Sequence, residues 1–382
     1  MDQYHVHHRQ ARCRQQSYTS EASFPFSSFL TTIPDEQMIQ AGYCANEPEC
    51  QWKRQTSFRY YCGGHYSWKS SFNEPGRVTV PDIALYTIGN FTIDDIVLWP
   101  TGQNWMGQPG GNVLFSALGA RVWLERVGLL ARVGRDYPPE RLREIEARGL
   151  YLSLHLVDLP TIHSWALYEA QGDRQFVNHL HSGSNVTMTI HPEEIEEEHL
   201  TGRAYHLAPA PVEQQAALVK HLKPSGGLIS LDPHELWING YETIIETMLA
   251  EVDFFLPSRF EARLLYGADV PEEAARAFAR WGPKVVVIKL GEDGSLVYDS
   301  LGERLVHVPA YPAQVWDTTG AGDAFCGGFL AGYLLTDDPV AAAQYGTVSA
   351  SYVVEAIGAL ATPQPTPAEA QTRLAYLKDK MG

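Results

Sequence analysis

The distribution of hydrophobic residues divides this chain near residue 80. From Asp82 onward, short apolar runs alternate with amphipathic stretches, which is typical of an α/β fold with a largely parallel sheet. Residues 1–80 are rich in Gln, Ser, Tyr, His and Arg and show neither helical nor strand periodicity. We therefore predict a poorly ordered extension at 1–80 and a folded domain at 81–382. The alternative, that residues 1–80 lie upstream of the true start of the protein, stays open.

Within the folded domain, Val/Ile/Leu-rich runs predict strands, and longer stretches of apolar or small residues predict helices. Strands are expected at 83–88, 127–133, 228–231, 254–256, 285–290 and 295–298. Helices are expected at 114–124, 321–335, 340–354 and 368–380. A β-hairpin is expected at 164–177, turning at Gly172-Asp173. Together with the segment 92–110, this hairpin is expected to form a small β-lid.

Composition and charge narrow the class of protein. The 382 residues are 45% hydrophobic and 19% charged, as in globular proteins that bury a large core. The formal net charge of −16 argues against nucleic acid as a partner, because an extended phosphate backbone requires cations to neutralise it. No apolar run approaches the roughly 18 residues of a transmembrane helix, and the N-terminus lacks a signal-peptide core. We therefore expect a soluble, cytoplasmic protein without a membrane partner.

Two groups of potential metal ligands stand out, and neither matches a metal-binding pattern. Four of the five cysteines lie in the first 80 residues with several histidines nearby: Cys13, Cys44, Cys50, Cys62, His5, His7, His8 and His65. A zinc site is conceivable there, but the spacings match none of the tight paired patterns. The acidic run 193–198 is interpreted as a solvated helix face or loop.

The segment 317–325, with the sequence DTTGAGDAF, carries the clearest chemical signal. It places the small residues Gly320, Ala321 and Gly322, and then the carboxylate of Asp323, at the predicted start of a helix. Small residues let backbone N–H groups approach an anion, and a helix N-terminus adds unpaired donors and partial positive charge. A carboxylate in the first turn is placed to take a proton from a hydroxyl beside a bound phosphate. This combination indicates phosphoryl transfer from ATP to an alcohol, although such an Asp can also serve only as a helix cap.

This segment resembles the second signature of the ribokinase-like (PfkB-type) carbohydrate kinases, and the resemblance extends over about residues 82–382. It implies a three-layer α/β/α fold with a mostly parallel central sheet and a small β-lid. In that family the last Asp of the motif is the general base and the Gly-Ala-Gly backbone forms an anion hole. These correspond here to Asp323 and residues 320–322. The resemblance also implies a monovalent cation, K⁺, near Asp317 and Thr319, and dimerisation through lid strands, as in many relatives, making a homodimer possible.

The loop after the first predicted strand and a later glycine-rich segment resemble the family's sugar-binding positions. Asp94 aligns with the carboxylate that accepts hydrogen bonds from substrate hydroxyls, a role that suits an acceptor-only group. Gly110, Gly111 and Asn112 resemble the first signature, in which the glycines let the backbone approach the sugar and the Asn supplies a donor and an acceptor. The Asn that usually follows four residues after the second glycine is replaced by Phe115, which makes the sugar pocket smaller or more apolar.

Two other segments resemble the family's Mg²⁺ and nucleotide positions. Glu261 aligns with the Glu of an Asn-x-x-Glu element that helps to hold the Mg²⁺–water network, with Ser258 in place of the Asn. Lys289, Gly291 and Gly294 resemble the turn that runs along the nucleotide, where glycines let ATP lie against the backbone. The implied cofactors are therefore ATP and Mg²⁺.

The resemblance predicts an enzyme that transfers the γ-phosphoryl group of MgATP to a hydroxyl of a sugar or sugar-like alcohol. Asp232, followed by His234 where relatives carry Asn, is expected to line the cleft. One alternative is a nucleoside kinase of the same fold, with Phe115 or Phe91 as a platform for the base. The other is a non-catalytic relative that binds sugar or nucleotide, motivated by the unusual residues Phe115, Ser258 and His234.

Overall fold

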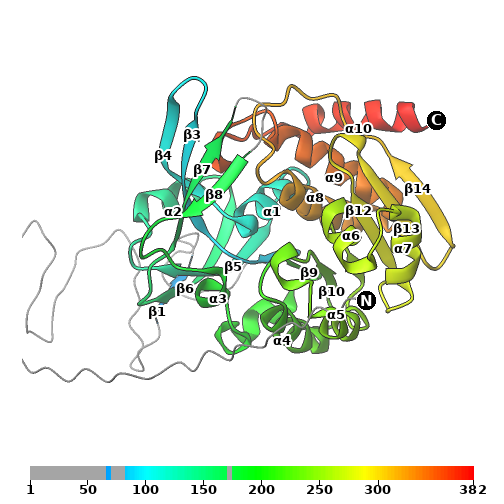
Figure 1. Ribbon diagram of the computed structural model, residues 1–382, viewed down its shortest axis with the longest axis horizontal. Helices are drawn as coiled ribbons and strands as arrows, with labels where there is room; N and C mark the ends of the chain where they lie inside the picture. Colours follow the sequence, from blue (N-terminus) through cyan, green and yellow to red (C-terminus); the bar gives the residue numbers. More distant parts are fainter. Residues whose placement is uncertain (1–65, 70–81, 170–173) are drawn as a thin grey trace, which may run out of the picture. The chain divides into compact units, whose positions relative to one another are not determined.

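Two β-sheets organise the part of the chain that the structure describes. The computed structural model describes residues 66–69, 82–169 and 174–382, which belong to one unit of the chain, Thr56–Gly382. Across these ranges the backbone forms a ten-stranded sheet and a separate four-stranded sheet (Figure 1). No helix in the described ranges is long and apolar enough to cross a membrane.

The large sheet is mostly parallel. Its strands, in spatial order, are β1 (Tyr66–Lys69), β6 (Leu150–Val157), β5 (Val127–Gly134), β2 (Leu85–Ile88), β9 (Ala204–Leu207), β10 (Leu228–Leu231), β11 (Phe254–Phe255), β12 (Val285–Lys289), β13 (Ser295–Asp299) and β14 (Arg304–Val308). The strands from β6 to β12 run parallel, while β1 pairs antiparallel at one edge and β13 antiparallel to β12 at the other. The chain adds strands on one side of β2 and then returns to add β9 on the other. Such a switch point opens a crevice at the carboxyl ends of the strands.

Helices cover both faces of the large sheet, giving the predicted three layers. One face carries α1 (Asn112–Arg121), α2 (Pro139–Glu146), α8 (Ala321–Thr336) and α9 (Pro339–Val353), which share a core with β2 and β5. The other carries α4 (Val212–Leu222), α5 (Glu242–Leu249), α6 (Arg259–Tyr266) and α7 (Pro271–Ala279). Strand residues alternate between these cores: Leu129 faces the first and Leu130 the second. Beyond α9 lies α10 (Pro367–Met381), and the short α3 is Asn185–Met188 (Figure 1).

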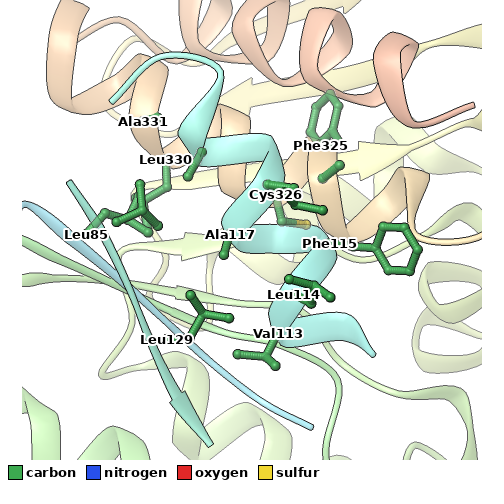
Figure 2. Close-up of a cluster of buried hydrophobic side chains, with 14 of the residues drawn as sticks. Leu85, Val113, Leu114, Phe115, Ala117, Leu129, Phe325, Cys326, Leu330 and Ala331 are labelled. Carbon is green, nitrogen blue, oxygen red and sulfur yellow. The ribbon is translucent and has the colours of Figure 1, made fainter. Parts of the chain in front are cut away.

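Helix α8 is held in place by close contact with α1. A Cβ atom at Gly327 would overlap the backbone oxygen of Ser116, and one at Gly119 would overlap the backbone of Ala324. Figure 2 shows α1 with its buried side chains beside Cys326 and other residues of α8. The small residues after the DTTGAGD segment are therefore required by packing. This packing fixes the position of the N-terminus of α8.

The four-stranded sheet is the lid expected from the sequence. Its order is β4 (Gln103–Gly110), β3 (Thr92–Leu98), β7 (Ile162–Tyr168) and β8 (Arg174–Asn178), with β3 and β7 parallel. A small apolar cluster of Ile96, Ala166 and Tyr168 forms on one face, with Ile357 packed against it. The expected turn at Gly172-Asp173 lies outside the described residues.

The predicted elements are present, with small changes at their ends. The helices expected at 321–335, 340–354 and 368–380 are α8, α9 and α10, within one residue at each end. The first strand starts two residues later than expected, at Leu85, and the helix expected at 114–124 is α1, Asn112–Arg121. Strands β6, β9 and β14 were not predicted from the hydrophobic pattern. Both β6 and β9 carry Tyr and His among their apolar residues, which masks their burial.

Two sequence interpretations need correction. Tyr66–Lys69, inside the predicted extension, pair with β6 as strand β1, so the expectation of poor order is wrong for these four residues. Residues 1–65 and 70–81, with the four cysteines of the conceivable zinc site, lie outside the described residues. In the acidic run, Glu194 is not solvated: its side chain is about one-tenth exposed and bonds Arg132 at 2.6 and 2.7 Å. Its pKa is lowered, because these bonds outweigh the effect of burial.

Candidate active site

The N-terminus of α8 brings Asp323 and the small residues of the DTTGAGD segment together. Gly320 is the N-cap with φ 75°, a conformation that favours glycine, and a Cβ there would overlap the ring of Phe115. Asp323 lies in the first turn and is half-buried. The first N–H groups of a helix have no acceptor within it. Of these, Ala321 N–H donates to Thr318 O at 3.3 Å, a long hydrogen bond. The start of α8 thus combines backbone donors that have no acceptor within the helix with the Asp323 carboxylate.

The two aromatic residues considered as a base platform are both buried. Phe115 is 4% exposed and fills the space beside Gly320. Phe91 is fully buried and packs edge to face against Tyr137 at 5.7 Å. Neither ring face is open to a nucleoside, so this part of the nucleoside-kinase hypothesis is wrong as stated. Phe115 instead shapes the turn at Gly320.

A buried ion pair lies next to the start of α8, at the carboxyl ends of β10 and β12. Lys289 Nζ is 2.5 Å from Asp232 Oδ2 and 3.5 Å from Cys326 Sγ. It also lies near Gly322, 3.6 Å from where a Cβ would stand. Burial by itself would lower the pKa of Lys289, but the Asp232 carboxylate raises it above its usual value, so Lys289 is charged. Asp232 Oδ1 is buried and has no hydrogen-bond partner within the described residues.

Glu261 joins this cluster from the first turn of α6. It forms a capping box with Ser258: Ser258 N–H donates to Glu261 Oε2 at 2.7 Å, and Glu261 N–H donates to Ser258 Oγ at 3.2 Å. Burial, followed by the charge of Asp232, raises the pKa of Glu261 to about 7. Ser258, which stands where the family's element has Asn, therefore has a structural role, because serine is a preferred N-cap residue. His234 serves similarly, accepting from Leu236 N–H at 3.2 Å.

The hairpin between β12 and β13 continues from Lys289. Gly291 has φ 66° and Gly294 has φ 92°. A Cβ at Gly294 would overlap Val308 O, whereas one at Gly291 would meet nothing within 4 Å. Gly294 is thus required for the packing of β14 against the turn. Gly291 is exposed, and its backbone is accessible beside the Lys289 end of the cluster.

Asp94 extends from the lid strand β3 against the end of β4. Its carboxylate lies where a Cβ of Gly110 would stand, so only glycine fits there. Asp94 is 9% exposed, and burial, assisted by the negative charges of Asp317 and Asp95, raises its pKa to about 7. The nearby Thr92 side chain acts in the opposite direction. The carboxyl group therefore titrates near neutral pH.

Asn112 ties two strand ends together through its side chain. Its Oδ1 accepts from Asn90 N–H at 2.8 Å, and its Nδ2 donates to Pro209 O at 2.7 Å. The preceding residue, Gly111, has φ 100°, and a Cβ there would overlap Asn90 O, so glycine is required at this position. Asn112 thus holds the loops after β2 and β9, which flank the switch point of the sheet. One lone pair and one N–H of its amide remain for another contact.

Asp317 and Thr319 contact the lid. Tyr168 Oη donates to Asp317 Oδ1 at 2.5 Å and lies 2.5 Å from Thr319 Oγ1. Thr319 N–H also donates to Asp317 Oδ1, at 2.7 Å. The two residues predicted to bind K⁺ are therefore engaged with a tyrosine of β7. This tyrosine gave no signal in the sequence, because a Tyr in a short strand resembles a core residue.

The predicted residues fall into two groups. Asp232, Glu261, Lys289 and Asp323 converge at the carboxyl ends of β10, β11 and β12, where charge interactions link Asp232 to the other three. Asp94 and Asp317 form a second group at the lid, with Gly110 and Tyr168. The short segment from Asp317 to Asp323 connects them. The described residues thus combine a carboxylate at a helix N-terminus, a lysine held in an ion pair and a separate small sheet.

Comparison with known proteins identifies the family. The pfkB family carbohydrate kinase model matches residues 92–367, and the chain belongs to that family. It is 31% identical over 252 residues to a cytidine kinase from Thermococcus kodakarensis, covering 65% of this chain and 88% of that protein. It is 28% identical to a fructokinase from Klebsiella pneumoniae, covering 77% and 97%. The family match establishes a kinase with an alcohol group as acceptor.

Solved structures show the same fold. A putative ribokinase II from E. coli, in complex with ATP and Mg²⁺, matches with a TM-score of 0.64 at 22% identity, covering 77% of this chain and 99% of that one. The ribokinase-like α/β/α fold with its lid, inferred from the sequence, is therefore confirmed.

Proposed function

We propose that this protein transfers the γ-phosphoryl group of MgATP to a hydroxyl of a sugar or sugar-like alcohol. One observation carries the proposal: Asp323 lies in the first turn of α8, and the charged ammonium group of Lys289 lies close to the neighbouring residue Gly322. Positioning and electrostatic stabilisation are the main contributions a protein makes to phosphoryl transfer. The crevice supplies both in one place.

Asp323 accepts the proton of the attacking hydroxyl. Backbone N–H groups of the turn at residues 320–322 lie against the charge on the transferring group, supported by the positive end of α8. Lys289 adds a full positive charge near Gly322. Its ion pair with Asp232 holds the ammonium group in position at the end of β12.

Asp232 and Glu261 are the groups that suit Mg²⁺ or its water ligands. Both are buried carboxyl groups, and Asp232 Oδ1 is a buried acceptor that lacks a hydrogen bond among the described residues. When bound, Mg²⁺ neutralises charge on the phosphate oxygens. Burial, and then the neighbouring charge of Asp232, raises the pKa of Glu261 to about 7, and Mg²⁺ held by this carboxyl group would favour its ionised form. On the nucleotide side, the exposed backbone at Gly291 extends from Lys289.

Asp94 orients the acceptor alcohol from the lid. A carboxylate grips adjacent hydroxyls, and here it lies beside Gly110, where the backbone leaves no side chain between strand and ligand. Asn112 contributes indirectly by holding the loops after β2 and β9. Closure of the lid on the acceptor excludes water, the competing phosphoryl acceptor.

A role for K⁺ stays a prediction at Asp317 and Thr319. Asp317 Oδ1 accepts two hydrogen bonds, from Tyr168 and Thr319. The donor set therefore fits a latch between the lid and the DTTGAGD segment better than a vacant cation site. Equal turnover in potassium, sodium and choline salts would support the latch, and activation by potassium alone would support the cation.

A nucleoside kinase is the second candidate, and one observation favours it. The Thermococcus kodakarensis relative, named a cytidine kinase, is 31% identical over 88% of its length. Because Phe91 and Phe115 are buried, the base would need a different contact surface. The primary hydroxyl of a nucleoside ribose is the same chemical acceptor as that of a free sugar, so Asp323 would serve in both.

The test is ADP release by the full chain with MgATP and a panel of sugars, sugar phosphates and nucleosides. Asp323→Asn provides the blank. Turnover with one class that is absent in the variant supports the proposal and identifies the acceptor. Measurable ATP binding without turnover above the blank, for every acceptor, would overturn it.

A further inference from the structure

A cluster of metal-binding side chains lies on the lid, away from the residues of the proposed reaction. Asp95 comes from β3, His163 from β7, and His179 follows the end of β8. Asp95 Oδ2 is 3.0 Å from His163 Nε2 and 3.1 Å from His179 Nε2, and the three ligand atoms lie within 4.8 Å of one another. The three ligand atoms are therefore already gathered at one place on the lid, and the two imidazole rings must turn so that both Nε2 lone pairs point at one ion.

The strand register places this cluster on the opposite face of the lid from Asp94. In β3 and β7, Asp94 pairs with Ser164 and Leu98 with Tyr168, so these alternate positions share the face that reaches Asp317. Asp95 and His163 occupy the intervening positions, and His179 N–H donates to His163 O at 2.8 Å, which places His179 opposite it. The cluster is thus separate from the acceptor and Mg²⁺ positions.

The carboxylate is fixed in the orientation that a metal ligand needs. Asp95 is 6% exposed, and its Oδ1 accepts from Gly107 N–H at 2.6 Å. Gly107, with φ 61°, lies where the β3–β4 register shifts between Asp94 and Ile96, which is a β-bulge. The bulge turns this N–H toward Asp95 and leaves Oδ2 directed at both histidines. Bulges are known to re-aim side chains next to functional sites.

The two imidazole rings are also held by packing, and one ring nitrogen lacks a hydrogen bond. The rings of His163 and His179 stack at 3.8 Å and 11°, and Trp165 stacks on His179 at 4.6 Å. His179 Nε2 is buried, and despite its proximity to Asp95 it makes no hydrogen bond within the described residues. A buried nitrogen without a hydrogen-bond partner is costly unless another partner satisfies it. A metal ion between the three groups would do so.

We propose that Asp95, His163 and His179 bind a divalent transition metal ion, with Zn²⁺ the ion that the site fits best. Two imidazole nitrogens and one carboxylate oxygen are characteristic zinc ligands, and the fourth tetrahedral position is left for water. Mg²⁺ and Ca²⁺ prefer sites made of oxygen ligands, so this site discriminates against the Mg²⁺ of the nucleotide. The metal ties β3 to β7 and β8 and so stiffens the lid.

Zinc content tests the proposal on the full, untagged chain after equilibrium dialysis against micromolar Zn²⁺. Because the cysteines at 13, 44, 50 and 62 can add zinc of their own, the informative quantity is a difference. The double variant Asp95→Asn/His179→Gln is expected to bind one equivalent less than the unaltered protein. Zinc is also expected to raise the melting temperature of the unaltered protein more than that of the double variant.

The matched control is His181→Asn, which removes an exposed imidazole from the same turn. His181 has φ 66°, a conformation that asparagine tolerates, so this substitution should fold normally and keep its zinc. Cobalt(II) gives a second readout, because the spectrum of the unaltered protein itself reports the kind of ligand. The difference spectrum between the unaltered protein and His163→Gln should contain visible d–d bands without a thiolate charge-transfer band, because this site has His and carboxylate ligands only. Equal zinc in the unaltered protein and the double variant, or loss of zinc in His181→Asn, would overturn the assignment.

Discussion

The carboxyl edge of the large sheet and the lid present two different ways of placing polar groups. At the edge, Asp232, Glu261 and Lys289 come from the ends of neighbouring parallel strands, and α8 is locked by its contacts with α1. The lid has four strands and a small apolar cluster around Tyr168. Groups that perform chemistry belong on rigid elements, whereas recognition and water exclusion need an element that moves. In the proposed reaction, the chemistry falls to the edge, and recognition of the acceptor and exclusion of water fall to the lid.

Charge compensation separates the two regions further. At the edge, Lys289 balances Asp232 directly. On the lid, the Asp94 carboxyl group is buried and lies near the negative charges of Asp317 and Asp95, and these effects raise its pKa to about 7. A group kept in this costly state is a candidate for ligand binding, because a ligand that donates hydrogen bonds would relieve the cost. Buried carboxyl groups therefore have a raised pKa in both regions, Glu261 at the edge and Asp94 on the lid, and at the edge a lysine lies beside them.

Removing the proposed base is expected to have the largest effect. Asp323→Asn should lower kcat by about 10²–10⁴-fold, the usual contribution of a positioned general base. Asp337→Asn makes the same change at the other end of α8, where a left-handed Asn is tolerated, and should leave kcat unchanged. Steady-state kinetics on both proteins measures this. Near-normal turnover in Asp323→Asn would remove Asp323 from the base role.

Disturbing the turn before α8 should come next. Gly320→Ala introduces a Cβ at φ 75° and against the ring of Phe115, which displaces the anion-binding turn. A loss of about 100-fold in kcat is expected, comparable with losing one oxyanion-type donor. The control is Gly226→Ala, which has φ 76° but open space around the added Cβ. If both variants lost activity equally, backbone strain alone would explain the result.

Changing the lid carboxyl group should weaken binding and alter the pH dependence. Asp94→Asn removes charged hydrogen bonds to the acceptor, so kcat/KM should fall by about 10- to 100-fold. The free energy of unfolding, in contrast, should be higher for the variant than for the unaltered protein at alkaline pH. The folded protein holds the Asp94 proton up to about pH 7, so the stability from Asp94 is complete at acid pH and is lost as pH rises toward 7. At about pH 8 the variant should be the more stable, by on the order of 2 kcal/mol.

Denaturant unfolding near pH 8 and near pH 5 measures this difference. The pKa of Glu261 is raised in the same range, but Glu261 is present in both proteins and its contribution cancels. A variant that is less stable than the unaltered protein at both pH values would contradict the pKa argument without affecting the role of Asp94 in binding.

Breaking the latch between lid and edge should have the smallest effect. Tyr168→Phe removes the hydroxyl that contacts Asp317 and Thr319. One or two hydrogen bonds are worth about 1 kcal/mol net, so a roughly five-fold fall in kcat/KM is expected. Tyr86→Phe removes a buried hydroxyl that makes no hydrogen bond in the described part of the chain, and is the control. If Tyr168→Phe lowered kcat/KM no more than Tyr86→Phe does, the Tyr168 hydroxyl would have no role in coupling the lid to the DTTGAGD segment.

The edge of the large sheet was largely predictable from the sequence, and on the lid the sequence indicated Asp94 and Gly110 but neither Tyr168 nor the cluster of Asp95, His163 and His179. The residues 317–323 form one continuous segment, so motif, helix start and carboxylate all appear together in the sequence. Glu261 was found with Ser258, although the sequence did not show that Ser258 caps the helix. Lys289 was assigned to the nucleotide turn, and its pairing with Asp232 depends on two strands that meet only in the folded sheet.

The local sequence therefore determined the three-layer α/β/α fold class, the DTTGAGD segment and the family. Hydrophobic periodicity and short motifs are properties of neighbouring residues, and they survive without knowledge of the fold. Tertiary structure alone decided which polar groups meet. His163 lies 68 positions from Asp95, and Tyr168 lies 149 positions from Asp317. Such contacts arise from strand register and from the bulge at Gly107, because a shift of one residue in a strand moves a side chain to the other face of the sheet.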